Sequence, residues 1–279
     1  MSDPYVVDDP ALGERVADWY TGASLARAGT VTRLGASAWA LRTPDYPKSF
    51  AHNAILVRGD PGADQLIAWA DDMLADAHHR YVHALCDLGE GTRAGLLAAG
   101  YALTGLVHMA LALPGADLPL PDGVAVEPAG QDVVGRLHAV LWRTEWLPGI
   151  CDDEVAQLVA RRSQPAAGSE LLSWVVRDPE LEDPVSGDLA ACLDLDVRGW
   201  AAEVDAVATR APARGRRYAD ALLRVAVRAA HERGCSHAVL SALTDDWPLH
   251  WYARRGFGVV GVCWEALRRL DGLAVNVPS

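Results

Sequence analysis

The residues best suited to chemistry in this chain are arginines at the start of a long amphipathic segment. Residues 214–219 read RGRRYA and directly precede a helical pattern that runs to Arg233. A helix N-terminus offers unpaired backbone N–H groups and the positive end of the helix dipole, and guanidinium groups add charge. The sequence therefore predicts a site for a pyrophosphate at residues 214–219. A solvated charged turn without a ligand is the alternative.

The elements that must position this turn follow from the spacing of apolar residues. One helix face with the i, i+3, i+4 spacing is formed by Ala219, Leu222, Leu223, Ala226 and Ala230. Gly234 can end this helix in a left-handed conformation. The apolar runs at 202–209 and 238–243 are short enough to be buried strands. The predicted unit is a strand, a basic loop, a helix and a second strand.

This unit resembles the GNAT superfamily of acyl-CoA-dependent N-acyltransferases, whose signature loop Arg/Gln-x-x-Gly-x-Gly/Ala joins the fourth strand to the third helix. Arg214 and Ala219 match the first and last motif positions, whereas Arg217 stands where the family has its first glycine. A bulky side chain there could weaken cofactor binding, or could turn outward and add a charge. The resemblance implies that the pyrophosphate is held by Arg214, Gly215, Arg216, Arg217, Tyr218 and Ala219.

Two further segments match the family and imply its chemistry. Glu203 stands where some members have a strand glutamate that serves as general base, so it is expected to remove a proton from the acceptor ammonium. The segment from Tyr252 to Phe257 resembles the family's Tyr-x-x-x-Gly-Phe, in which the tyrosine protonates the departing thiolate. A packed aromatic side chain beside Trp251 is the alternative for Tyr252. The pantetheine arm is expected along the backbone of Val207, Ala208 and Thr209.

The acceptor side is expected near the segment 142–146. This segment connects the first two helices of the predicted domain, a connection that in the family commonly overhangs the acceptor. Glu145 and Trp146 are expected to help shape an amine pocket, with plain packing as the alternative. Asp194 and Asp196 alternate along a predicted strand and so share one face, where they could attract a cation or lie in solvent.

The chain is predicted to contain two domains of similar element order. Residues 113–123 hold three prolines and two glycines without apolar periodicity, which is typical of a linker. We therefore expect a degenerate GNAT-like domain at 1–121 and an acyltransferase domain at 122–279. This layout resembles tandem bacterial GNAT proteins. The predicted fold class is α/β (α+β), with a mixed sheet of GNAT type in each domain.

The N-terminal domain is expected to bind no acyl-CoA. Its loop at 59–64 carries Asp60 and Asp64 and no basic residue, so a phosphate would be repelled there. One cofactor per chain is the consequence. The N-terminal domain is then structural or forms a wall of the substrate cleft.

Composition limits the other classes of function. The net charge of −12 argues against a general nucleic-acid binder and is compatible with a cationic amine substrate. No apolar run approaches about 20 residues, and the N-terminus lacks a signal-peptide pattern, so we expect a cytoplasmic protein without a membrane span, monomeric or homodimeric. The 5 cysteines are expected to be reduced thiols. The histidines His78, His79 and His83 do not share one helix face, so no metal site is expected.

These observations predict an acyltransferase that moves an acyl group, expected to be acetyl from acetyl-CoA, to a primary amine of a small molecule. The sequence does not identify the acceptor, which could be an antibiotic, a metabolite or a protein N-terminus. Two alternatives stay open. One is a non-catalytic protein of the same fold that binds a small molecule or acyl-CoA, and the other is an enzyme of that fold with a different donor.

Overall fold

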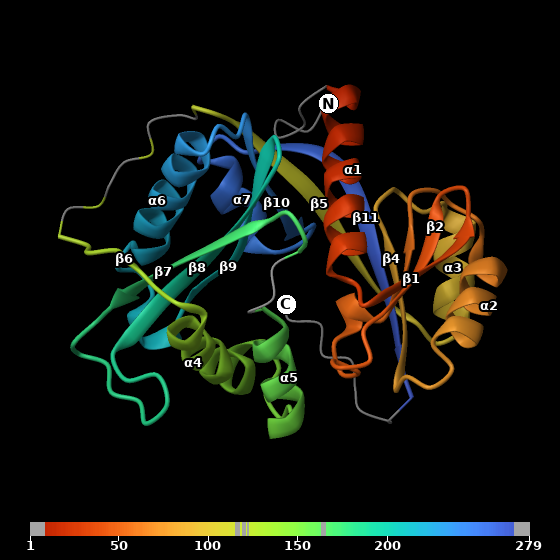
Figure 1. Ribbon diagram of the computed structural model, residues 1–279, viewed down its shortest axis with the longest axis horizontal. Helices are drawn as coiled ribbons and strands as arrows, with labels where there is room; N and C mark the ends of the chain where they lie inside the picture. The colour runs from red at the N-terminus through yellow and green to blue at the C-terminus, as the bar shows by residue number, and fades with distance from the viewer. Residues whose placement is uncertain (1–8, 115–117, 119–120, 122, 163–165, 271–279) are drawn as a thin grey trace. The chain divides into compact units, whose positions relative to one another are not determined.

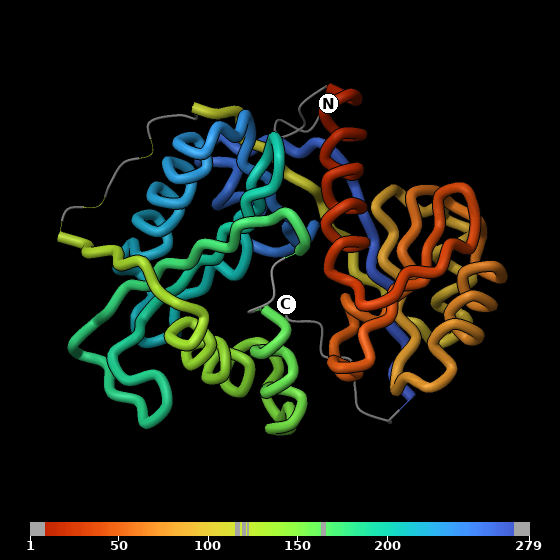
Figure 2. Tube along the Cα trace, in the orientation of Figure 1, coloured from red at the N-terminus to blue at the C-terminus, as the bar shows by residue number. Residues whose placement is uncertain are grey.

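The computed structural model describes residues 9–270, apart from 115–117, 119–120, 122 and 163–165. Its contacts divide the chain into two compact units. The first contains the chain up to Met109 together with the chain from Ser241 onward, and the second runs from Ala110 to Leu240. Figure 1 shows the elements, and Figure 2 follows the same Cα trace. The mixed parallel and antiparallel pairing within the units confirms the predicted α/β class.

The first unit is built on a mixed sheet. Its strands, in order across the sheet, are β1 (Thr30–Gly35), β2 (Ala38–Arg42), β3 (Ala54–Val57), β4 (His79–Ala84), β11 (Gly258–Arg269) and β5 (Ala102–Ala112). The pair β3 and β4 is parallel, and the helix α2 (Ala63–Met73) connects them. The helix α1 (Pro10–Arg27) packs on β11, whereas α2 packs on β3, β4 and α3 (Glu90–Ala98). The buried core of this unit includes Ile55, Leu66, Ala70, Val82 and Leu96.

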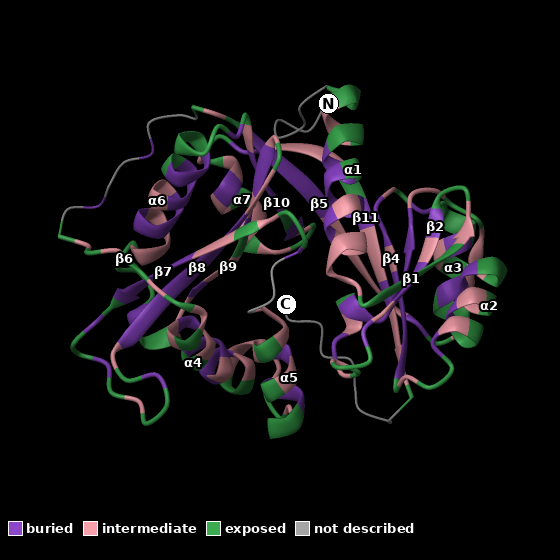
Figure 3. Cartoon of the chain, in the orientation of Figure 1, coloured by how far each residue is buried: buried purple, intermediate pink, exposed green. Residues whose placement is uncertain are grey.

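The second unit is also built on a sheet, and it carries the predicted anion site. Its strands, in order, are β10 (His237–Leu243), β9 (Ala201–Thr209), β8 (Leu189–Arg198), β7 (Glu170–Arg177) and β6 (Glu127–Pro128). The helix α6 (Tyr218–Glu232) packs on β7, β8 and β9. The helix α4 (Gln131–Leu141) packs on β7 and β8, and α5 (Asp152–Arg162) packs on α4. The strand β8 is buried from Leu189 to Asp196 (Figure 3). This buried stretch includes Asp194 and Asp196.

The division by contacts differs from the predicted boundary near Pro121. The strand β11 pairs antiparallel with β4, from Trp264 opposite Ala84 to Arg269 opposite His79. The last strand among the described residues therefore joins the sheet of the N-terminal half. The helix α1 lies so close to β11 that a Cβ at Gly13 would be 2.3 Å from the carbonyl oxygen of Val260. The boundary between residues 121 and 122 stays a prediction about the two sequence halves.

The strands predicted at 202–209 and 238–243, and the helix predicted between them, agree closely with β9, β10 and α6. The connection after α4 was not predicted in its observed form. Residues Trp142–Trp146 continue α4 as a π-helical turn, in which Leu147 N donates to Trp142 O at 3.1 Å. A π-type turn inside a helix is rare and frequently marks a functional site. It is not visible in apolar spacing, because one wide turn changes the period only locally. Among the described residues no helix is long and apolar enough to cross a membrane.

Candidate functional site

The strands β9 and β10 are paired at one end, and Glu203 marks where that pairing stops. The parallel ladder runs from His237 opposite Ala201 to Val239 opposite Glu203. The strand β9 continues beyond this point to Thr209. Glu203 is half-buried and occupies the last position of the ladder. The residues of β9 after Glu203 can therefore turn their backbone groups toward a ligand.

A bulge in β9 begins at Ala206, after two further residues that pair regularly with β8. Cys192 of β8 lies opposite Ala208, and Asp194 lies opposite Asp205. Two residues of β9, Ala206 and Val207, therefore face one residue of β8. Ala206 has a φ of 50°, which lies in the left-handed region that few residues other than glycine adopt. A bulge whose first residue is left-handed locally disrupts the ladder and re-aims the strand, and such bulges are common next to active sites.

The loop at the start of α6 contains a second left-handed residue. Arg217 is the N-cap of α6 with φ 64° and ψ 21°, and its side chain caps no backbone N–H group. Arg217 stands at the position where the GNAT signature loop has its first glycine. Among the described residues, Ala206 and Arg217 are the two that adopt a positive φ without being glycine. The chain thus holds L-residues in a strained conformation at both ends of the segment that joins the bulge to α6.

The arginines of the predicted anion site are held by carboxylates. Arg216 contacts Asp178 at 2.6 Å and Glu180 at 2.8 Å, and Arg217 contacts Asp220 at 3.3 Å. Tyr218 donates its hydroxyl to Asp178 at 3.1 Å. The loop therefore has fixed geometry, and much of its positive charge is neutralised by neighbouring acids.

Arg214 forms an ion pair with Glu145, one of the two residues expected in an amine pocket. The Glu145 carboxylate also accepts a hydrogen bond from the backbone N–H of Ala211 at 2.9 Å. The Arg214 side chain is 61% exposed and that of Glu145 is 15% exposed. A carboxylate thus occupies a guanidinium and a backbone donor of the loop, so an entering phosphate would compete with Glu145.

Trp146, the other expected pocket residue, packs beside α4. Its ring lies edge-on to Trp142, with centroids 5.0 Å apart, and 5.6 Å from the ring of His138. Burial lowers the pKa of His138 to about 3, so this imidazole is neutral. The described contacts of Trp146 are with these rings and with the core around Val134 and Leu137. The acceptor roles of Glu145 and Trp146 stay predictions.

Tyr252 lies in the short helix α7 (Trp247–Ala253) and belongs to the first unit, whereas Glu203 and the loop belong to the second. It is 8% exposed, and its ring packs edge-on against Trp251 and Phe257 at 4.8 and 5.6 Å. Tyr252 therefore has the contacts expected of a packed aromatic side chain, which is the alternative to a catalytic role. Those contacts are compatible with a hydroxyl that also acts on a leaving group, so its catalytic role stays a prediction.

A buried polar cluster on β8 was only partly visible in the sequence. Asp194 and Asp196 share the buried face, as their alternation predicts, and the solvated alternative is excluded because they are 1% and 3% exposed. Burial raises the pKa of Asp194, although Arg162 and Ser173 oppose that shift. Burial lowers the pKa of Arg162, but Asp205 and Asp194 outweigh it and raise the pKa above its usual value. Arg162 is the last residue of α5, and nothing in the local sequence indicated a buried ion pair.

In the first unit the loop before α2 holds an aspartate whose carboxylate accepts several hydrogen bonds. The Asp60 carboxylate accepts hydrogen bonds from Gly62 N at 3.0 Å, Gly89 N at 2.7 Å and the Thr92 hydroxyl at 2.7 Å. Burial raises the pKa of Asp60, but these hydrogen bonds outweigh it and lower the pKa below its usual value. The carboxylate is therefore ionised and repels a phosphate.

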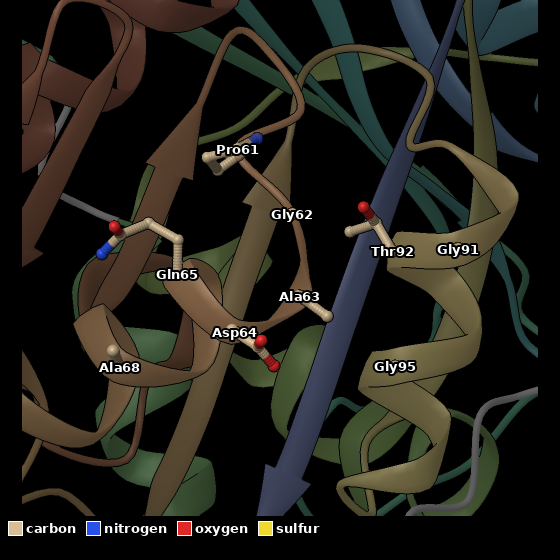
Figure 4. A pocket seen from close by; sticks show the side chains of 9 residues that line it. All are labelled: Pro61, Gly62, Ala63, Asp64, Gln65, Ala68, Gly91, Thr92 and Gly95. Carbon is tan, nitrogen blue, oxygen red and sulfur yellow. The ribbon is translucent and has the colours of Figure 1, made fainter.

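A cavity of about 680 Å³ lies beside Asp60, between the first turns of α2 and α3 (Figure 4). Its only ionisable lining residue among those described is Asp64. The close packing of the two helices limits it, because a Cβ at Gly95 would lie 2.5 Å from that of Ala63. Such a lining supplies no cation for an anionic ligand.

Comparisons with known proteins agree with this geometry. Residues 143–257 match the model of the acetyltransferase (GNAT) family. A search of curated proteins found no match. Among solved structures, a functionally unknown conserved protein from Staphylococcus epidermidis is similar at 11% identity and a TM-score of 0.67, over 86% of this chain and 94% of that chain.

Two other similar structures carry family names. A GCN5-related N-acetyltransferase from Kribbella flavida has 16% identity and a TM-score of 0.60, over 91% of this chain and 95% of that chain. A tandem GNAT protein from the clavulanic acid biosynthesis pathway has 14% identity and a TM-score of 0.51, over 96% and 98%. At these identities the likeness establishes the fold, which is the tandem GNAT fold that the sequence predicts.

The left-handed backbone at Arg217 predicts an unusual order of stability. Arg217→Gly and Arg217→Ala both delete the contact with Asp220, but only glycine adopts a positive φ without steric cost. The left-handed conformation costs an L-residue about 1–2 kcal/mol, and the greater freedom of unfolded glycine offsets about half of this. We expect the glycine variant to be more stable than the alanine variant by about 0.5–1 kcal/mol in urea unfolding.

Arg228, an exposed residue inside α6, provides the matched control. Its backbone is helical, so Arg228→Gly should be less stable than Arg228→Ala by about 1 kcal/mol. The same order at both positions would contradict the assignment of strain to Arg217.

Proposed function

We propose that this chain, whose residues 143–257 match the model of the acetyltransferase (GNAT) family, transfers the acetyl group of acetyl-CoA to a primary amine of a small molecule. The observation that carries the proposal is the pair of left-handed residues, Ala206 and Arg217. Such residues cost of order 1–3 kcal/mol each, persist only where the surrounding structure fixes them, and cluster at active sites. Both lie on the segment where the proposal puts the donor.

The proposed donor site runs from the bulge to the first turn of α6. The pyrophosphate would lie at the N-terminus of α6. The side chain of the N-cap residue, Arg217, does not hydrogen-bond to the backbone N–H groups there. The side chains of Arg214 and Arg217 are more than half exposed. The pantetheine arm would lie along the backbone of Val207, Ala208 and Thr209. These groups fit the donor because they combine cationic side chains with backbone beyond the end of a strand ladder.

The proposed chemistry needs two proton transfers. The acceptor is an ammonium at neutral pH, so Glu203 removes a proton, directly or through water, to give the nucleophilic amine. The amine nitrogen bonds to the thioester carbonyl carbon, and the carbon–sulfur bond then breaks. Tyr252 gives its proton to the departing thiolate. The net charge of −12 favours the approach of a cationic acceptor.

A binding protein of the same fold without catalysis is the second candidate. The pairing of Arg214, Arg216 and Arg217 with carboxylates favours it, because a cofactor must compete with those acids. The two candidates separate by turnover. An acetyltransferase releases the free thiol of CoA when an amine is added, whereas a binding protein holds its ligand unchanged.

Calorimetric titration with acetyl-CoA tests the donor site. We expect Arg214→Ala to weaken binding by about 1.5–3 kcal/mol, the range for hydrogen bonds to charged groups. Arg214 is a better probe than Arg216, whose loss would leave Asp178 buried beside Glu180. Arg228→Ala removes an exposed arginine of the same helix and should leave the affinity unchanged. Equal affinity of the wild type and Arg214→Ala would contradict the assignment.

The role of Tyr252 is tested by Tyr252→Phe, which keeps the ring contacts with Trp251 and Phe257 and deletes the hydroxyl. A general acid contributes roughly 10²–10⁴ in rate, so kcat for thiol release should fall at least about tenfold, while the melting temperature and acetyl-CoA affinity stay nearly constant. The assay uses acetyl-CoA with the primary amines that support turnover in a screen. A loss in kcat below about threefold, under ~0.7 kcal/mol of barrier, would show that Tyr252 only packs.

A further inference from the structure

The guanidinium of Arg162 joins α5 to the two strands that form the bulge. Its Nε and Nη2 donate to Asp194 Oδ2 at 3.1 and 3.0 Å, and Nη2 also donates to Asp205 Oδ2 at 2.9 Å. The Arg162 side chain is 14% exposed. Asp194 and Asp205 are cross-strand partners directly beside the bulge. One cation therefore spans both strands at the point where their register changes.

Asp194 is itself fixed by neutral hydrogen-bond donors. Its Oδ1 accepts a hydrogen bond from the Ser173 hydroxyl at 2.5 Å, and that hydroxyl accepts one from Gln131 Nε2 at 2.6 Å. These residues come from β7 and the first turn of α4. Hydrogen bonds thus connect Gln131 to Ser173, Ser173 to Asp194 and Asp194 to Arg162, so Asp194 anchors the guanidinium of Arg162.

The bulge residue Ala206 is held at both of its backbone polar groups. Its N–H donates to Asp205 Oδ1 at 2.7 Å, and its carbonyl accepts from the Cys192 thiol at 3.6 Å. Burial raises the pKa of Cys192, so the thiol keeps the proton that it donates. The Asp205 carboxylate thus uses one oxygen for Arg162 and the other for Ala206.

This arrangement opposes the natural tendency of Ala206 to leave its left-handed conformation. The side chain of Asp205 is 50% exposed, so without Arg162 it could turn toward water and release the N–H of Ala206. The hydrogen bond from Arg162 Nη2, a group that Asp194 also fixes, restrains the Asp205 carboxylate against this turn. The ion pair therefore restrains the backbone conformation as well as neutralising charge.

We propose that Arg162 is a positioning residue, which acts through Asp205 to hold the β9 bulge at Ala206 in the geometry that aims the following backbone at the acyl group. The effect on catalysis rests on the proposed function, since the bulge aligns a thioester only if acetyl-CoA binds there. The restraint on Ala206 itself does not depend on any ligand. The two parts can therefore be tested separately in the full-length protein.

The principal variant is Asp205→Asn, which keeps the size of the side chain and places an amide opposite Arg162. It leaves the buried pair of Arg162 and Asp194 intact, so the protein should fold. Asp188→Asn is the matched control. Asp188 directly precedes β8 and is also ion-paired, to Arg177 at 2.5 Å. Arg162→Lys keeps the charge and loses the planar fork, and should give an intermediate effect.

The first measurement is hydrogen exchange at the Ala206 amide, followed by NMR without ligand. Exchange should be at least about tenfold faster in Asp205→Asn than in the wild type, and unchanged in Asp188→Asn. If the Ala206 amide exchanged at an unchanged rate in Asp205→Asn, the restraint on Ala206 would be overturned, whether or not the protein is an acetyltransferase.

The second measurement uses acetyl-CoA labelled with ¹³C at the carbonyl. In the wild type the bound carbonyl resonance should differ from that of the free compound, and in Asp205→Asn it should move back toward the free value while the affinity stays within about threefold. Thiol release should fall by about tenfold or more, since small misplacements of a reacting group are costly. Arg162→Lys combined with Asp205→Asn should be no slower than the slower single variant, because both act through one contact.

The outcomes separate the inference from the proposed function. If the wild type binds and turns over acetyl-CoA, and Asp205→Asn matches it in both resonance and rate, the positioning role is overturned and the proposed function stands. If the wild type does not bind acetyl-CoA, the proposed function and the catalytic part of the inference are overturned, and the amide exchange alone decides the restraint on Ala206.

Discussion

The segment from β9 to α6 depends on keeping two L-residues in the left-handed backbone conformation. Ala206 forms the bulge that interrupts the ladder of β9 with β8, and Arg217 is the N-cap of α6, whose side chain caps no backbone N–H group. Each is accompanied by an acid–arginine contact, Asp205 with Arg162 and Asp220 with Arg217. Strain of this kind survives only where the surrounding structure fixes it. The donor site that we propose is built from the backbone that this strain exposes.

Charge distinguishes the two halves of the chain at equivalent points. In the C-terminal half the loop before α6 supplies arginines, whereas in the N-terminal half the loop before α2 supplies Asp60, which binds the donors that a phosphate would use. Both loops lead into the N-terminus of a helix, α6 in one half and α2 in the other. The N-terminal half also receives β11 as part of its sheet.

Local structure and the family could be predicted from the sequence because both depend on short-range patterns. The apolar spacing of α6, the strands beside it and the arginine loop were all evident within single segments, and the family match at 143–257 confirms the resemblance. The pairing of β11 with β4 could not be predicted, because strand partners far apart in sequence leave no local signal. The ion pair of Glu145 with Arg214 and the cluster around Arg162 depend on the same tertiary contacts.

The position of the donor is the central claim, and hydrogen–deuterium exchange of the full chain with and without acetyl-CoA tests it most directly. A donor bound between the bulge and α6 should slow exchange across residues 205–219 and leave residues 60–64 and 89–92 unchanged, because Asp60 already occupies those donors. Protection at 60–64 and 89–92 without protection at 205–219 would contradict the account, and so would the absence of any protection at saturating acetyl-CoA.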